Sequence, residues 1–270
     1  MPATEVVDLK RQAVRLAESV REAGALALSM FKTPLKNWTK GEALSPVSDA
    51  DIAVDVLLRE RLAGDGATIA WLSEESIDDP ARLDARYVWI VDPIDGTRAY
   101  IAGLPDWAVS AALVDNGRPI AACLCAPVSD EFFMAVTGQG ATRNGAAITV
   151  APGAELAQAR IAAPRRLLER LQSIAPPFAV MPRTHSLALR LARVAEGTFD
   201  AGIAGGNSHD WDLAAADLLV HEAGGALTSF EGVAVTYNRP VPRHGTLVAA
   251  GRERHVALLE LFRDERLASL

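Results

Sequence analysis

The chain has 270 residues, half of them hydrophobic and 23% charged, a composition typical of a globular protein with a sizeable buried core. The formal net charge is −7 and no long Lys- or Arg-rich run occurs, which argues against a nucleic-acid polymer as partner. No hydrophobic run approaches the roughly 18 residues of a membrane span, and the N-terminus does not resemble a signal peptide. We therefore expect a cytoplasmic protein that does not associate with membranes.

The N-terminal part is expected to be helical. Hydrophobic residues recur at helical spacing over 6–31, which predicts a long amphipathic helix. The segment 33–46 is polar and contains two prolines and a glycine, which indicates a loop. Ser48 is placed to cap a second helix over 49–62, with Asp51 in its first turn.

The middle of the chain predicts a sheet. We expect three to five strands over 68–150, including an antiparallel meander at 108–114, 120–126 and 132–136. The meander contains the two cysteines of the chain, Cys123 and Cys125. Residues two apart on one strand share a face but lack disulfide geometry, so we expect both to be buried free thiols.

After residue 152, predicted strands and helices alternate, which indicates a second sheet covered by helices. The expected strands are 160–163, 199–203 and 246–250, and the expected helices are 165–174, 185–196, 211–223 and 255–267. No long linker interrupts the chain. We therefore expect residues 1–270 to form one unit of two packed lobes, the first over about 1–150 and the second over about 151–270.

The most informative run is Trp89–Thr97, where a hydrophobic strand ends in two carboxylates, Asp92 and Asp95. A proline stiffens the backbone between them, Gly96 frees the following turn and Thr97 supplies a hydroxyl. Carboxylates at the end of a strand, followed by a glycine turn, suit a hard cation that in turn holds a phosphate. Asp, Pro and Gly are also common in surface turns, which is the alternative interpretation.

Two other segments place acids at the ends of elements. Glu74 and Glu75 follow the hydrophobic run 67–72. Asp210 is expected to cap the helix over 211–223, which places Asp212 in the first turn. An acid in a first turn also stabilises the helix dipole by about 0.3–1 kcal/mol, so a purely structural Asp212 is the alternative.

These three segments, in this order, resemble the signature of the inositol monophosphatase superfamily, and the likeness extends from Lys40 to about Gly251. The resemblance implies an α/β (α+β) fold, a five-layer α/β/α/β/α sandwich. It also implies a catalytic unit that hydrolyses a small phosphorylated metabolite with two to three Mg²⁺ ions, through a single displacement by metal-activated water. Lithium inhibition and a homodimer follow from the resemblance as well, with the meander at 108–136 as a possible edge or face for association.

The resemblance also implies the metal ligands. Glu74, Asp92 and the backbone carbonyl of Ile94 correspond to the ligands of the first ion. Asp92, Asp95 and Asp212 correspond to those of the second, with Asp92 bridging. A third, weaker ion would lie near Glu74, and Asp212, contributed by the second lobe, would also contact the substrate.

Further roles follow from the same resemblance. Asp51 and Thr97 correspond to the pair that orients and deprotonates the attacking water, and Glu74 is the third catalytic residue. The amides of Gly96 and Thr97 would face the phosphate at a helix N-terminus. Lys40 corresponds to a loop lysine near the metals.

The substrate side departs from the animal inositol monophosphatases. Their acid that binds sugar hydroxyls, seven positions before the second-metal aspartate, is Gly205 here. His185 replaces a usual glycine before the substrate-facing helix, and Arg98 follows Thr97 where a threonine is typical. We take His185 and Arg98 as candidate substrate contacts, although Arg98 is equally explained as a solvent-exposed charge.

Several substrates therefore remain open. Inositol monophosphate and adenosine 3′,5′-bisphosphate, the substrate of a 3′(2′),5′-bisphosphate nucleotidase, are close competitors, followed by histidinol phosphate or a sugar phosphate. A different class is a non-catalytic binding or regulatory protein on the same scaffold. The complete set of acids argues against that class.

Overall fold

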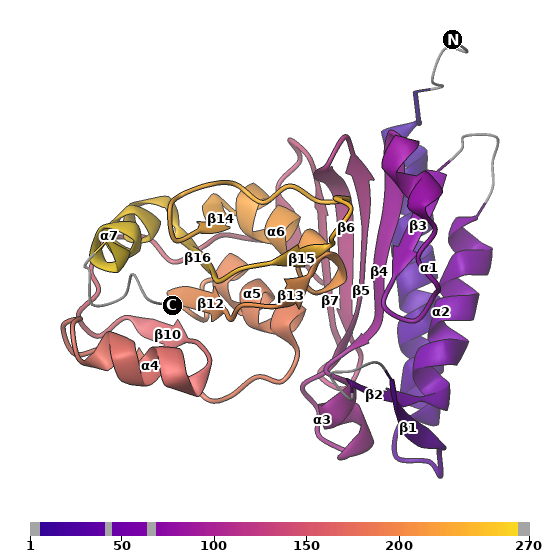
Figure 1. Ribbon diagram of the computed structural model, residues 1–270, viewed down its shortest axis with the longest axis horizontal. Coiled ribbons are helices and arrows are strands. Elements are labelled where there is room, and N and C mark those ends of the chain that lie inside the picture. Colours follow the sequence, from indigo (N-terminus) through magenta and orange to yellow (C-terminus); the bar gives the residue numbers. More distant parts are fainter. Residues whose placement is uncertain (1–5, 41–44, 64–68, 264–270) are drawn as a thin grey trace.

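The computed structural model describes residues 6–40, 45–63 and 69–263 (Figure 1). The protein is a five-layer α/β/α/β/α sandwich, as the family resemblance implies. Its first layer consists of α1 (Leu9–Met30) and α2 (Asp49–Leu62), and α5 (Leu187–Ala195) and α6 (Asp210–Glu222) form the middle layer. The outer layer consists of α4 (Arg165–Gln172) and α7 (Arg252–Phe262).

Two sheets separate the helical layers. The larger sheet has the order β3-β4-β5-β6-β7-β8-β9, formed by β3 (Ile69–Ser73), β4 (Tyr87–Asp95), β5 (Ala108–Asp115), β6 (Arg118–Ala126), β7 (Glu131–Val136), β8 (Ala141–Arg143) and β9 (Ala146–Ile148). The smaller sheet has the order β11-β10-β12-β16-β14, formed by β10 (Arg160–Ala162), β11 (Ala179–Val180), β12 (Ala201–Ala204), β14 (Gly225–Ser229) and β16 (Leu247–Gly251).

Short elements complete the described residues. They are the hairpin of β1 (Asn37–Lys40) and β2 (Ser45–Ser48), the 3₁₀ helix η1 (Pro80–Asp84), the short helix α3 (Thr97–Ile101), and the pair β13 (Ser208–His209) and β15 (Arg243–His244). None of the helices in the described ranges combines the length and hydrophobicity needed to span a bilayer.

The first helical layer packs on one face of the larger sheet through a continuous hydrophobic stripe. Leu16, Val20 and Ala23 of α1 are fully buried there. Gly24 lies so close to β6 that a Cβ atom would stand 2.5 Å from the sulfur of Cys125. Both cysteines are free and buried, as expected.

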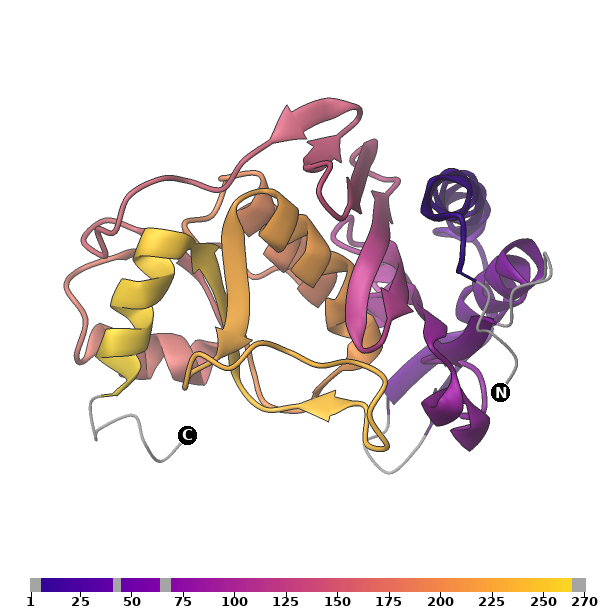
Figure 2. The same cartoon turned by 90° about the horizontal axis from the view of Figure 1, so that it is seen from above.

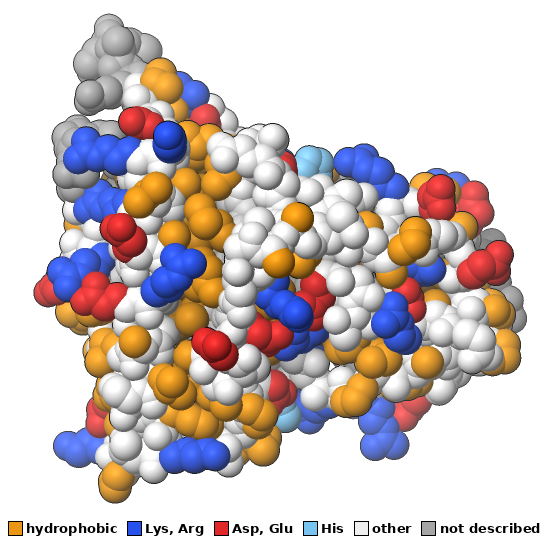
Figure 3. All heavy atoms as spheres, turned by 180° about the vertical axis from the view of Figure 1, so that it is seen from behind, with side chains coloured by type: hydrophobic (Ala, Val, Ile, Leu, Met, Phe, Trp, Pro, Cys, Tyr) orange, Lys and Arg blue, Asp and Glu red, His pale blue; other side chains and the backbone are white. Residues whose placement is uncertain are grey.

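The middle helices lie between the two sheets, which Figure 2 shows from above. Their facing side chains are mostly small, such as Ala188, Ala192 and Ala215, and all are buried. Small side chains let both helices approach both sheets closely, so the turns that begin α5 and α6 come close to the end of β4. On the face shown in Figure 3, hydrophobic side chains gather over the half with α1 and α2, and charges of both signs are interspersed.

Three sequence predictions of the fold were wrong. The segment 33–46 is not only a loop, because 37–40 and 45–48 pair as a hairpin in which each strand supplies the other's hydrogen-bond partners. The larger sheet has seven strands rather than three to five, because β8 and β9 have only three residues each. The meander at 108–136 offers neither edge nor face, since its strands are interior and helices cover both faces.

Candidate active site

The site begins where β4 loses its regular register. β4 is buried along its whole length and pairs with β5, but the pairing shifts between Asp92 and Asp95. Residues three apart on a regular strand point to opposite faces, whereas a bulge inserts an extra residue and turns the strand. The irregularity therefore lets both carboxylates of the strand end point to the same place.

Asp212 approaches the same place from the first turn of α6. Its Oδ2 accepts a hydrogen bond from the backbone N–H of His209 (2.7 Å), which forms one arm of a capping box. The carboxylate oxygens of Asp92, Asp95 and Asp212 lie within 4.8 Å of one another. The structure thus brings together the three acids predicted for the second metal site.

The helix cap differs from the prediction. His209, not Asp210, is the N-cap residue, and its ring stacks on Trp211 with centroids 4.6 Å apart. Asp210 is fully buried and accepts hydrogen bonds from His244 Nε2 (2.6 Å) and from the backbone N–H of Asn238 (2.7 Å). Its carboxylate therefore links α6 to the segment around β15, and we assign it a structural role.

Burial makes the acid cluster electrostatically unfavourable without a cation. Desolvation raises the pKa of Asp95 to about 7, and the charge of Asp212 adds to the rise. Burial also raises the pKa of Asp92 well above its ordinary value, reinforced by Glu74 and Asp95. Hydrogen bonds from Ser186 Oγ and the Ala188 amide, both 2.6 Å from Asp95 Oδ2, oppose the shift of Asp95 only in part.

Glu74 borders the cluster. Its backbone N–H donates to the carbonyl of Val91 (3.3 Å), which fixes Glu74 next to the end of β4. Burial raises the pKa of Glu74 to about 8, the positive charge of Lys40 opposes this, and Asp212 adds to it. Glu74 is not one of the acids whose oxygens meet within 4.8 Å, so it flanks the cluster.

Lys40 does reach the acids, at the end of β1. Its Nζ lies 3.5 Å from Glu74 Oε1 and 2.6 Å from Glu75 Oε1, and it donates to the carbonyl of Glu74 (2.8 Å). The Glu75 side chain is only 2% exposed. The sequence places Glu75 beside Glu74 but assigns it no role in the site, and the structure shows it paired with Lys40.

The side chains of Asp51 and Thr97, predicted to act as a pair, lie next to each other. Thr97 Oγ1 lies 3.1 Å from Asp51 Oδ1 and 3.0 Å from the carbonyl oxygen of Ile94. Ser48 fixes the other carboxylate oxygen of Asp51 through its amide (2.8 Å) and hydroxyl (2.6 Å). Burial raises the pKa of Asp51, while these hydrogen bonds lower it. The capping box of α2 thus also orients a candidate catalytic carboxylate.

Gly96 is required by two independent features of the turn. Its φ is +98°, in the left-handed region that L side chains rarely adopt. A Cβ atom there would lie 3.1 Å from the carbonyl oxygen of Asp106 and 3.3 Å from the amide of Ser186, both backbone atoms. The turn that separates Asp95 from Thr97 can therefore adopt this path only with glycine.

The two candidate substrate contacts, His185 and Arg98, lie in different places. His185 lies directly before the turn that holds Asp95, and Asp106 accepts from its backbone N–H (2.6 Å) and pairs with its Nδ1 (2.7 Å). Sequence reasoning missed Asp106. Arg98 is exposed and lines a different hollow, together with Trp38 and Ile101. This placement matches the surface-charge interpretation of Arg98.

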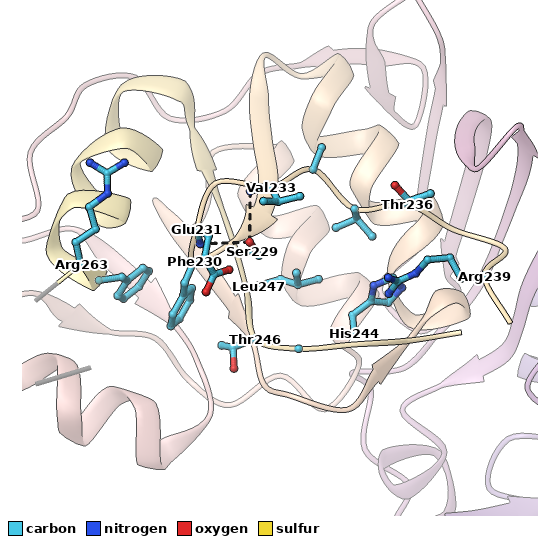
Figure 4. Close-up of a pocket in the computed structure, with 14 residues that line it drawn as sticks. Ser229, Phe230, Glu231, Val233, Thr236, Arg239, His244, Thr246, Leu247 and Arg263 are labelled. Atoms are coloured by element: carbon cyan, nitrogen blue, oxygen red, sulfur yellow. Dashed lines mark hydrogen bonds between the residues drawn. The ribbon is translucent and has the colours of Figure 1, made fainter. Parts of the chain in front are cut away.

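A larger cavity of about 760 Å³ lies elsewhere, between the segment 229–247 and the end of α7 (Figure 4). Its lining includes Arg239 and Arg263 and a single acid, Glu231. None of the candidate site residues lines it. The chemistry predicted from the sequence therefore belongs to the acid cluster and not to this cavity.

The donor set of the cluster suits a hard divalent cation. Carboxylate oxygens, with a backbone carbonyl at Ile94 close by, are the ligands that Mg²⁺ and Ca²⁺ prefer. His and Cys side chains, which soft metals favour, are not among the clustered ligands.

Known proteins resemble this chain in sequence and in fold. Residues 9–267 match the model of the inositol monophosphatase family. The chain belongs to this family. It is similar to an inositol-1-monophosphatase of Rhizobium meliloti (34% identity, covering 69% of this chain and 73% of that protein) and to a histidinol-phosphatase of Mycobacterium tuberculosis (35%, 80% and 84%).

Other family members cover nearly the whole chain. The Nus factor SuhB of Salmonella typhimurium strain LT2 is 31% identical, over 94% of this chain and 95% of that protein. The crystal structure of extragenic suppressor protein suhB from Bartonella henselae superposes with a TM-score of 0.81 at 28% identity, covering 93% and 98%. Family and relatives together indicate a phosphatase.

We expect replacement of Gly96 by alanine to damage both stability and the site. The left-handed conformation alone costs about 1–3 kcal/mol for a residue with a side chain, and the contact with fixed backbone atoms adds to it. Gly138 has a φ of +75° but nothing within 4 Å of its Cβ position, so Gly138→Ala is the matched control. Thermal denaturation should show a larger loss for Gly96→Ala, and equal losses would contradict this account.

The raised carboxyl pKa values predict a pH-dependent response to metal. Unfolded Asp and Glu titrate near about 4, whereas Asp95 and Glu74 titrate at about 7 and about 8 when folded. The folded state thus binds more protons between these values, and the metal-free protein loses stability as pH rises through this window. A bound cation offsets the repulsion. Mg²⁺ should raise the melting temperature more at about pH 8 than at about pH 5.5, and equal shifts would contradict the cluster as its site.

Proposed function

We propose that the protein is a Mg²⁺-dependent phosphomonoesterase that hydrolyses a small phosphate ester. The supporting observation is that the carboxylates of Asp92, Asp95 and Asp212 meet within 4.8 Å, beside the hydrogen-bonded pair of Asp51 and Thr97. In this proposal residues 1–270 are one catalytic unit, and the second lobe completes the site by supplying Asp212.

The metal sites are assigned to the chain's own oxygens. Asp92, Asp95 and Asp212 would hold one ion, and Glu74 with Asp92 and the Ile94 carbonyl would hold another. When bound, such ions neutralise the dianionic phosphate, lower the pKa of water and stabilise the leaving oxygen. The fold itself positions the ligand side chains. They are held by the bulge in β4, the cap of α6 and the hydrogen bond from the first turn of α5.

Asp51 and Thr97 are assigned to the attacking water. The hydroxyl of Thr97 has one proton, which it donates either to Asp51 or to the Ile94 carbonyl. Its lone pairs then accept a hydrogen bond from water, and the proton lost by water passes through Thr97 to Asp51. Because Ser48 fixes Asp51 Oδ2, the oxygen that receives the proton is Oδ1.

Replacing Asp95 with asparagine tests the metal assignment. We expect Asp95→Asn to abolish phosphate release, because a neutral amide no longer balances the cation charge, while the hydrogen bonds with Ser186 and Ala188 leave the fold intact. Phosphate release is measured by malachite green on inositol 1-phosphate, adenosine 3′,5′-bisphosphate and histidinol phosphate, with and without Mg²⁺. Unchanged turnover in this variant, with circular dichroism unaltered, would reject the assignment.

Asp51 has a matched control within the same helix turn. We expect Asp51→Asn to lower kcat by about 10²–10⁴-fold, the usual contribution of a general base. Asp49, also in the first turn of α2, instead accepts from the backbone N–H of Lys36 (3.2 Å). Asp49→Asn should therefore retain near-normal kcat, and similar losses in both variants would show that the effect is structural.

Lithium gives an independent test of the cation site. If Li⁺ displaces Mg²⁺ from oxygen ligands, turnover should be inhibited at roughly tens of millimolar LiCl and restored by added Mg²⁺. NaCl at the same ionic strength is the control. Inhibition that NaCl reproduces would be only a salt effect.

A non-catalytic role is the alternative from another class, and it is motivated by the Salmonella relative that bears the name Nus factor. The buried carboxylates favour catalysis, because burial and mutual repulsion make them costly to keep in a protein without use for a cation. Wild-type protein that releases no phosphate from any tested ester with Mg²⁺ present would favour the alternative.

A further inference from the structure

A second cavity, of about 550 Å³, lies beside the segment that leads into α5. Its lining includes Pro164, Met181, Arg183, Thr184 and Arg190. Thr184 is two residues from Ser186, whose hydroxyl holds Asp95 (2.6 Å). Two residues span at most about 7 Å between their Cα atoms, and the charge of Asp95 acts on Arg190 in the cavity lining, so the cavity lies near the acid cluster.

The position at which the family resemblance would place a polyol-binding acid lies at the boundary of this cavity and has no side chain. Gly205, which stands at the hydroxyl-binding position of the animal enzymes, has no side chain. A Cβ atom there would lie 3.3 Å from Cγ of Pro164, a residue of the cavity wall. Gly205 therefore neither recognises hydroxyls nor places a negative charge at this boundary.

The cavity is instead positively charged. Arg190 is half-buried and donates to the carbonyl oxygens of Thr184 (2.7 Å) and Ile203 (3.3 Å), both uncharged. Within the described part of the chain, neither Arg190 nor Arg183 forms an ion pair with a carboxylate, whereas the exposed Arg165 on the rim pairs with Glu169. Burial lowers the pKa of Arg190, Asp95 opposes this, and the charge of Arg183 lowers it further.

Two neighbouring guanidinium groups that form no ion pair in the described residues are suited to bind an oxyanion. Arginine binds phosphate with paired N–H donors, and a bound anion would remove the repulsion between Arg183 and Arg190. A hydroxyl or an ammonium group would gain little there. The geometry thus distinguishes among the substrates that the family resemblance left open.

We propose that this arginine-lined cavity binds a second phosphate of the substrate, so that the enzyme prefers small bisphosphates to the corresponding monophosphates. The proposal rests on the phosphatase function proposed above. Between the cluster and the cavity, Asp106 fixes the ring of His185 through Nδ1 (2.7 Å), which keeps this wall of the binding site rigid.

Two nucleotides that differ by one phosphate test the subsite. Adenosine 3′,5′-bisphosphate and adenosine 3′-monophosphate present the same scissile ester, and only the first has a 5′-phosphate. We expect wild-type kcat/KM to favour the bisphosphate at least tenfold, and Arg183→Ala to move this ratio toward 1 mainly through KM. Arg166→Ala, an exposed arginine of α4 outside the cavity lining, should keep the wild-type ratio.

The outcomes separate the subsite from the function. Turnover of both nucleotides at equal kcat/KM, or a ratio unaffected by Arg183→Ala, would overturn the subsite and leave the phosphatase intact. If neither nucleotide is hydrolysed, calorimetric titration of the same two nucleotides into wild type and Arg183→Ala decides. Tighter binding of the bisphosphate that is lost in the variant supports the subsite, and equal binding of both nucleotides overturns it.

Arg190→Lys, which keeps the charge but not the paired donors, should show a kcat/KM ratio for bisphosphate over monophosphate between those of wild type and Arg183→Ala.

Discussion

The concentration of buried carboxylates at one end of β4 is the constraint on which the rest of the structure depends. Asp92 and Asp95 are buried, and they and the partly exposed Asp212 repel one another, so the three side chains are held by hydrogen bonds that do not neutralise them. The holders are ordinary features of helix and strand ends: a register shift, a capping box, and the amides of a first helical turn. The fold thus supplies the geometry, and a cation supplies the missing charge.

Several elements serve structure and site together. The Ser48–Asp51 capping box begins α2 and also presents the free oxygen of Asp51 to Thr97. The N-cap and first turn of α5 hold Asp95, while Thr184, two residues before that N-cap, lines the arginine cavity. The sheets and the small-residue helices between them are tightly packed. A shift of the N-terminus of α5 would therefore move both the residues that hold Asp95 and the wall of the arginine-lined cavity.

Much of the candidate site could be predicted, because its residues belong to continuous runs whose chemistry is local. The Asp-Pro-Ile-Asp-Gly-Thr turn identified Asp92, Asp95 and Thr97 without any tertiary information. Helix ends were less certain, and His209 rather than Asp210 proved to be the cap, because Asp210 finds better partners in His244 and a distant backbone amide. The hairpin at 37–48 was missed for a similar reason, since each short polar strand is stabilised only by its partner.

The sequence by itself determined the family resemblance, and through it the layered class of the fold, and it also identified the acids available for metal binding, since both depend on motifs of residues close together in the chain. The tertiary structure decided which residues meet. It joined Lys40 to Glu75 and His185 to Asp106, placed Arg98 elsewhere, and gathered Arg183 and Arg190 around one cavity. These contacts join different elements, and their distances are set by how sheets and helices pack, which no local pattern encodes.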